Sequence, residues 1–248
     1  MTEQFTHDQF MALALKQASY GQLIARPNPA VGCVLVKDNK VVGAGFTQEA
    51  GGPHAEVMAM RAAGDLAVGS TAYVTLEPCS HYGRTPPCSL SLIEAGVSCL
   101  VYGCQDPNPQ VSGQGLAQLR AANVEVVGPV MQAECEMSNV GFLQRMGTFK
   151  PYVINKMAMS LDGRTAMESG ESQWITSAES RAQVHLLRAQ SCAVITGIGS
   201  VLRDDPSMNV RADELALAGV PQATIDRIQQ PLRVVLDSQL RLPVSARL

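Results

Sequence analysis

One histidine and two cysteines constrain the fold of this chain more than any other feature of its sequence. They occur, in order, as His54-Ala-Glu56, Pro78-Cys79 and Cys88. If these side chains bind one metal ion, the start of a helix near His54 must lie close to the end of a strand before Cys79. Sheets covered by helices bring such ends together, so the pattern favours an α/β fold.

The donor set is the one that zinc uses in catalytic sites. One His and two Cys supply three ligands and leave the fourth tetrahedral position open for water, whose pKa zinc lowers toward neutrality. Glu56 is placed to take a proton from that water and pass it to a leaving amine. This order of residues is the signature of zinc nucleobase deaminases, here with a wider separation of Cys79 and Cys88.

Two simpler interpretations stay open from the residues alone. Free cysteines are most often small buried hydrophobes, so Cys79 and Cys88 can be packing residues. A structural zinc site is the other alternative, and it needs a fourth ligand. By sequence, only His81 and Cys33 are plausible for that position. A structural site has no use for Glu56.

Hydrophobic periodicity predicts alternating helices and strands in the first part of the chain. Its first helix begins with a capping box formed by Thr6 and Gln9. The two first strands are expected to form a hairpin across Asp38-Asn39. The expected helices are 7–19, 54–63, 89–95, 113–122 and 131–146, and the expected strands are 30–36, 41–46, 71–76, 98–103 and 124–127.

A second unit is expected to follow, which places the domains at residues 1–147 and 150–248. Its predicted elements are strands over 151–159, 193–196 and 232–236, a helix over 178–189, and a polar, partly helical stretch over 212–230. Gly197-Ile-Gly199 follows a strand, but this short pattern indicates no more than a tight turn.

Charge and cysteine usage exclude several classes of protein. The chain has 19 Lys+Arg against 22 Asp+Glu, a net charge of −3, which argues against a nucleic-acid binder. It has no apolar run of about 20 residues, and its polar N-terminus lacks the core of a signal peptide. Seven cysteines, an odd number, do not indicate a disulfide framework. We therefore expect a cytoplasmic protein with no nucleic-acid or membrane partner.

Longer motifs around these residues resemble the family of bifunctional deaminase–reductases of riboflavin biosynthesis. The resemblance covers nearly the whole chain and lies in both expected domains. The matching stretches are 26–33, 51–56, 77–88, 105–111, 160–166, 169–177 and 187–190.

The resemblance implies a cytidine-deaminase-like α/β/α sandwich followed by an incomplete dihydrofolate-reductase-like α/β domain. It implies zinc-dependent deamination of a small phosphorylated pyrimidine, 2,5-diamino-6-(5-phosphoribosylamino)pyrimidin-4(3H)-one. It then implies reduction of the ribosyl group to ribityl by NADPH, and a homo-oligomer. Zinc deamination of another nucleoside or nucleotide is the alternative. Because the family's reductase domain continues past Leu248, we expect a truncated chain with a working deaminase and no working reductase.

The resemblance also implies roles for particular residues. His54, Cys79 and Cys88 would bind zinc, and Glu56 would be the catalytic proton carrier. The implied substrate contacts are Asn28, Arg84, Ser172, Arg188, Met208 and Arg211, and the implied NADPH contacts are Ala158, Trp174, Ser200, Asp204 and Ser238. Some of these have plainer interpretations. Asn28 suits an Asx turn, Arg84 a solvated loop and Trp174 a half-buried packing position. Lys156 and Asp162 lie beside the same expected strand, where they could orient the ribose or form surface ion pairs.

Overall fold

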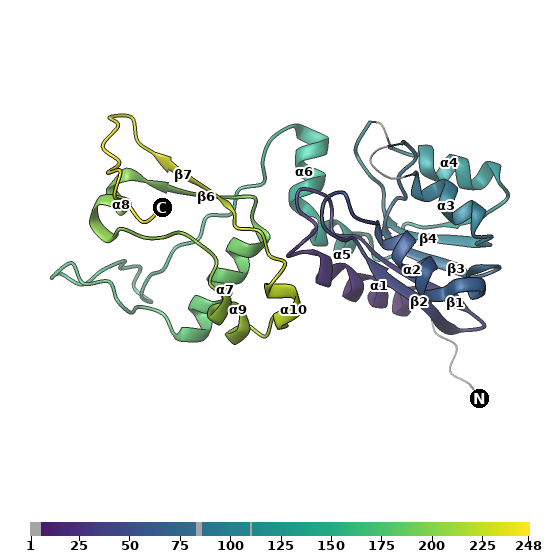
Figure 1. Cartoon of the computed structure of the whole chain (residues 1–248), viewed down its shortest axis with the longest axis horizontal. Coiled ribbons are helices and arrows are strands. Elements are labelled where there is room, and N and C mark those ends of the chain that lie inside the picture. The colour runs from purple at the N-terminus through teal and green to yellow at the C-terminus, as the bar shows by residue number, and fades with distance from the viewer. Residues whose placement is uncertain (1–5, 83–85, 110) are drawn as a thin grey trace. The chain divides into compact units, whose positions relative to one another are not determined.

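The computed structural model describes residues 6–82, 86–109 and 111–248. The chain divides into two compact units, the first ending at Val153 and the second beginning at Ile154 (Figure 1). No helix in the described part of the chain is long and apolar enough to cross a membrane.

Unit 1 is built on a sheet with the strand order β2-β1-β3-β4-β5. β1 is antiparallel to β2 and β3, whereas β3, β4 and β5 are parallel. Asp38 and Asn39 join β1 to β2, and their φ angles of 50° and 59° suit the tight turn of a hairpin. The strands are β1 (Gly32–Lys37), β2 (Lys40–Phe46), β3 (Thr71–Leu76), β4 (Cys99–Cys104) and β5 (Glu125–Val127).

Helices cover both faces of this sheet, which confirms the predicted α/β/α sandwich. α1 (His7–Gly21) and α5 (Gln132–Ser138) pack on one face, and α2 (Ala55–Ala63), α3 (Cys88–Glu94) and α4 (Gln114–Ala121) lie on the other (Figure 1). A short 3-10 helix, η1 (Gly64–Ala67), follows α2. The capping box of α1 is present, since the Gln9 side chain accepts the Thr6 N–H at 2.8 Å.

Close packing of α2 on the hairpin depends on glycine. A Cβ atom on Gly45 of β2 would lie 2.5 Å from Met58 Cβ and 2.6 Å from the Ala59 nitrogen. Because Gly45 has no side chain, α2 lies close against β2, and this contact fixes the position of the first turns of α2 relative to the sheet.

The helix expected over 131–146 is two helices, so that prediction is wrong at its centre. α5 ends at Ser138, and α6 (Val140–Thr148) begins after Asn139. The Asn139 side chain accepts the Ala30 N–H at 2.8 Å and donates to the Ala30 carbonyl at 3.0 Å. This contact with a distant segment fixes Asn139 at φ −130°, outside the helical range.

Unit 2 contains a two-stranded parallel sheet and four helices among its described residues. Ala182, His185 and Ala189 of its longest helix, α7, are buried, and this helix packs against α9. The elements are α7 (Ala178–Gln190), β6 (Ala193–Gly197), α8 (Ile198–Asp204), α9 (Ala212–Leu217), α10 (Gln222–Ile225) and β7 (Leu232–Leu236).

The strand expected over 151–159 is absent, so that prediction is also wrong. Val153, Ile154 and Met157 are 74%, 56% and 59% exposed. An apolar run forms a strand only when a neighbour accepts its ladder hydrogen bonds, and β6 and β7 pair only with each other. The run therefore stays irregular.

Candidate functional site

Four loops of unit 1 meet at one edge of its sheet. β1 starts at this edge and β2 and β3 end there, because Gly32 pairs with Phe46 and Cys33 pairs with Val74. β4 runs parallel to β3 and ends at the same edge. Among the described residues, this topology gathers segments 26–31, 47–54, 77–82, 86–88, 105–109 and 111–113.

Three side chains that could hold a metal ion converge at this edge. His54 is the N-cap of α2, Cys88 begins α3, and Cys79 follows β3. His54 Nδ1 is 3.2 Å from Cys88 Sγ and 3.7 Å from Cys79 Sγ. Tetrahedral zinc, with ordinary Zn–N and Zn–S bond lengths, separates such ligand atoms by about 3.6 Å. The donor atoms therefore fit a zinc ion, as the sequence predicted.

No fourth protein ligand completes this cluster among the described residues. All three ligand atoms of His54, Cys79 and Cys88 lie within 4.8 Å of one another, and the group includes neither Cys33 nor His81. Three ligands with an open position are the pattern of a catalytic zinc site. The structural-zinc alternative lacks the ligand that it requires in the described part of the chain.

The electrostatics of the cluster favour a thiolate on Cys79. A hydrogen bond from the Cys88 thiol lowers the pKa of Cys79 to about 4, with further help from His54 and the Cys88 backbone. The backbone contact is direct, since the Cys88 N–H donates to Cys79 Sγ at 3.3 Å. The thiolate is the form that binds metal.

Glu56 lies in the first turn of α2 and is only 3% exposed. Burial raises the pKa of its carboxyl, and the nearby Cys79 raises it further, whereas His54 lowers it. A carboxyl with a raised pKa can both accept and return a proton closer to neutral pH. Glu56 is therefore equipped for proton transfer beside the metal ligands.

Backbone contacts hold the two cysteines in place. The Ser89 N–H and hydroxyl both donate to the Cys79 carbonyl, each at 3.1 Å. These bonds join the two ends of the loop between Cys79 and Cys88. Arg84, a predicted substrate contact, belongs to this loop and lies outside the described residues.

A buried acid beside the cluster was given no role in the sequence prediction. Glu77 is 3% exposed, and its carboxylate accepts the Gly113 N–H at 3.0 Å. Its own N–H donates to the Cys104 carbonyl at 2.9 Å. Glu77 thus ties the segment before Cys79 to the start of α4. Its position in the sequence, directly before Pro78-Cys79, was the signal from which a role near the cluster could have been predicted.

Asn28 lies in a loop at the same sheet edge. Its N–H donates to the Ala25 carbonyl at 2.9 Å, which makes it part of a turn. The topology brings the Asn28 loop to the edge that carries the ligands, and a substrate contact stays a prediction.

A pocket of about 280 Å³ lies in unit 2. It collects five of the predicted cofactor and substrate residues together with Lys156: these are Ala158, Ser172, Trp174, Arg188 and Arg211. The remaining predicted residues of this unit do not line it: Ser200, Asp204, Met208 and Ser238.

Trp174 is not a half-buried packing residue. It is 68% exposed, and the Arg181 guanidinium lies 4.3 Å from its ring centroid. This cation–π contact holds the indole at the pocket.

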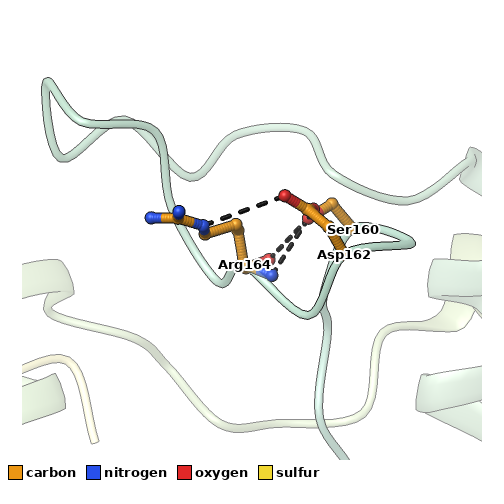
Figure 2. Close-up of polar contacts among 3 residues, drawn as sticks. All are labelled: Ser160, Asp162 and Arg164. Atoms are coloured by element: carbon orange, nitrogen blue, oxygen red, sulfur yellow. Dashed lines mark hydrogen bonds and ion pairs between the residues drawn. The ribbon is translucent and has the colours of Figure 1, made fainter.

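Asp162 belongs to a self-contained turn, shown in Figure 2. Its carboxylate lies 3.8 Å from Arg164 Nε, and both side chains are largely exposed. The Arg164 N–H donates to the Ser160 hydroxyl at 3.0 Å (Figure 2). The surface ion pair was the correct interpretation of Asp162, whereas Lys156 lines the pocket.

A helix-covered sheet that brings His-x-Glu to two cysteines defines the class of zinc-binding deaminase domains. The family model "Cytidine and deoxycytidylate deaminase zinc-binding region" matches residues 5–104, and "RibD C-terminal domain" matches residues 151–248. Riboflavin biosynthesis protein RibD of Escherichia coli is 55% identical over 95% of this chain. The protein of that name in Haemophilus influenzae is 51% identical over 96%. This chain is therefore similar to RibD proteins along nearly its whole length, in both of its domains.

Solved structures agree with this similarity. RibD of Acinetobacter baumannii has a TM-score of 0.89 and 49% identity, covering 97% of this chain and 66% of that one. A deaminase/reductase of Thermotoga maritima has a TM-score of 0.83 and 38% identity, covering 94% and 63%. The fold of unit 2 is therefore that of the dihydrofolate-reductase-like RibD C-terminal domain. The chain spans 64% of the length of the E. coli and H. influenzae relatives.

Proposed function

We propose that unit 1 is a zinc-dependent deaminase of riboflavin biosynthesis. Its substrate would be 2,5-diamino-6-(5-phosphoribosylamino)pyrimidin-4(3H)-one. The observation that carries the proposal is the meeting of His54, Cys79 and Cys88 with the buried carboxyl of Glu56. The T. maritima structure supports the substrate, since that protein is named a diaminohydroxyphosphoribosylaminopyrimidine deaminase and 5-amino-6-(5-phosphoribosylamino)uracil reductase.

In this mechanism His54, Cys79 and Cys88 would hold the metal ion, and it would supply an activated water molecule. When bound in such a site, zinc lowers the pKa of a water molecule toward neutrality. Glu56 accepts a proton from the attacking water and donates it to the exocyclic amine as the carbon–nitrogen bond breaks. The ring carbon keeps the water oxygen as a carbonyl, the second water proton goes to the neighbouring ring nitrogen, and ammonia leaves. Burial of Glu56 keeps its proton from exchanging freely with solvent during these steps.

We further propose that unit 2 contributes to the NADPH-dependent reduction of the ribosyl group. Arg188, Arg211 and Lys156 line one pocket and give it the positive charge that suits a phosphorylated substrate. Trp174 and Ala158 line the same pocket and are the proposed cofactor contacts there.

Zinc content and ammonia release, measured together, test the deaminase. Wild type, Glu56→Gln and the control Glu94→Gln, at the exposed end of α3, are compared on the proposed substrate. All three should hold about one zinc per chain. Ammonia release should fall by at least about 100-fold in Glu56→Gln alone, because only this variant loses the proton carrier.

The outcomes separate the parts of the proposal. A chain without zinc overturns the metal site, and full activity of Glu56→Gln overturns the assigned role. Zinc without ammonia release indicates deamination of another nucleoside or nucleotide. Binding of NADPH to the chain, followed by the fluorescence of Trp174, tests unit 2 independently of unit 1.

A further inference from the structure

In the segment between α8 and α9, the backbone makes hydrogen bonds like those of a β-strand, but it makes them with side chains. The Gln230 side-chain oxygen accepts the Val210 N–H at 2.7 Å, and its nitrogen donates to the Val210 carbonyl at 3.0 Å. A neighbouring β-strand would make the same pair of bonds. The flanking residues Asn209 and Arg211 are also held through their backbone, and we call residues 209–211 the clamped segment.

The other contacts to the clamped segment come from α7. His185 and Arg188 are three residues apart and therefore lie on one face of this helix. Arg188 Nη1 donates to the Asn209 carbonyl at 3.0 Å, and the Arg211 N–H donates to His185 Nδ1 at 3.2 Å. His185, Arg188 and Arg211 all line the pocket of unit 2. The contacts that His185 and Gln230 make with this segment, which we call the clamp, thus fix the backbone of Arg211 relative to α7, the helix that carries Arg188.

The position of Arg211 brings its guanidinium group near that of Arg188, so two positive charges lie at one pocket. Burial lowers the pKa of Arg188, and the nearby charge of Arg211 lowers it further. Glu214 lies 4.0 Å from Arg211 Nη1 and offsets part of this repulsion. Two guanidinium groups held at one pocket suit an anion with several oxygens, such as a phosphate group.

We propose that His185 and Gln230 are positioning residues for anion binding in this pocket. They clamp residues 209–211 and so hold the guanidinium group of Arg211 beside that of Arg188. Their part is to fix the backbone and not to bind the anion. The inference rests on the proposed function, which places a phosphorylated substrate in unit 2.

The contact with Arg211 also defines the protonation of His185. Nδ1 accepts the Arg211 N–H, so it carries no proton, and the neutral ring must be protonated at Nε2. Two-dimensional NMR of the ¹⁵N-labelled chain distinguishes this tautomer from the other.

Paired substitutions at His185 test the proposal. His185→Asn places an acceptor oxygen at the position of Nδ1, since both atoms are bonded to Cγ, whereas His185→Leu has nearly the same shape as Asn without an acceptor. Gln230→Leu removes the other half of the clamp, and Arg188→Gln removes one binding charge. Gln183→Ala, on the exposed surface of α7, is the control.

The probe is ribose 5-phosphate, titrated calorimetrically into the full chain at constant ionic strength. Thermal unfolding followed by Trp174 fluorescence shows which variants stay folded.

We expect roughly tenfold weaker binding in His185→Leu and Gln230→Leu, because a misplaced guanidinium loses its alignment with the anion. His185→Asn should restore most of the affinity, and Gln183→Ala should bind like wild type. Arg188→Gln should bind weakly with its folding intact.

Three results would overturn the inference. If folded His185→Leu and Gln230→Leu bind as wild type does while Arg188→Gln does not, the pocket binds anions without the clamp. If His185→Asn loses as much affinity as His185→Leu, the acceptor is not what matters. If wild type fails to bind the probe, or Arg188→Gln binds it unchanged, the pocket is not an anion site, and the substrate placement in unit 2 falls with the inference.

Discussion

At the scale of single residues, His185 links proton uptake to the stability of unit 2. Burial lowers its pKa below the usual value near 6.5, and the positive charges of Arg188 and Arg211 lower it further, against the opposite effect of Glu214 and Asp213. The unfolded chain therefore binds a proton at a pH where folded His185 is still neutral. Protonation also removes the acceptor for the Arg211 N–H.

We predict that His185 stabilises unit 2 above about pH 6.5, and that this contribution is lost as the pH falls through the lowered folded pKa. Urea unfolding at pH 7.5, 6.5 and 5.5, followed by Trp174 fluorescence, measures it. The unfolding free energy of wild type minus that of His185→Asn should decrease as the pH falls, because Asn does not titrate. A difference that stays constant or grows would contradict the prediction.

The zinc donors could be predicted from the sequence, whereas the positioning residues could not. His54, Cys79 and Cys88 have side chains whose chemistry and order already indicate zinc. Gln230 and His185 act through contacts with Val210 and Arg211, residues 20 and 26 positions away. Nothing in the local sequence of either residue indicates such a partner.

At the scale of elements, the approach of α2 to β2 connects packing to the metal site. α2 begins directly after its N-cap His54 and carries Glu56 in its first turn. We predict that Gly45→Ala lowers the unfolding free energy of unit 1 by about 1–3 kcal/mol, because the new methyl group collides with the backbone of Ala59. The shift of α2 should also weaken zinc binding.

Urea unfolding followed by circular dichroism and zinc competition with a chromogenic chelator measure the two effects. Gly141→Ala in α6 is a matched control, since its new methyl group would meet only Tyr152 Cβ at 3.8 Å. The control should keep both properties. Wild-type stability and zinc affinity in Gly45→Ala would show that α2 has room to move.

Elements were predictable where their signals are local. The capping box of α1 and the Asp38-Asn39 hairpin turn lie within a few residues of the elements they define, and both predictions are confirmed. The predicted strand over 151–159 failed because strand formation needs a partner in space. The helix break at Asn139 was missed because Ala30, which holds its side chain, is 109 residues away.

At the scale of the whole molecule, the two units should respond differently to loss of metal. The proposed zinc ligands and the main hydrophobic core belong to unit 1, and the single tryptophan, Trp174, belongs to unit 2. A ligand that binds only the folded state stabilises it by about 2.7 kcal/mol at 100 times its Kd. At a free zinc concentration of about 100 times the Kd, removal of zinc should therefore destabilise unit 1 by roughly this amount.

Thermal unfolding with and without a chelator measures this effect by two signals. Circular dichroism should show a lower transition temperature for unit 1, while the fluorescence transition of Trp174 should stay where it was. Cys88→Ser, which lacks a ligand, should be insensitive to the chelator. Equal shifts of both signals in wild type would show that the units unfold together.

The bonds that join the two ends of the segment between Cys79 and Cys88 have a consequence for how this stretch of chain tolerates change. The Ser89 N–H and hydroxyl donate to the Cys79 carbonyl, and the Cys88 N–H donates to Cys79 Sγ. All of these donors lie on Cys88 and Ser89, where the segment ends. We therefore expect the spacing of the two cysteines to withstand substitutions between them, so that this spacing and the intervening sequence can change independently during evolution.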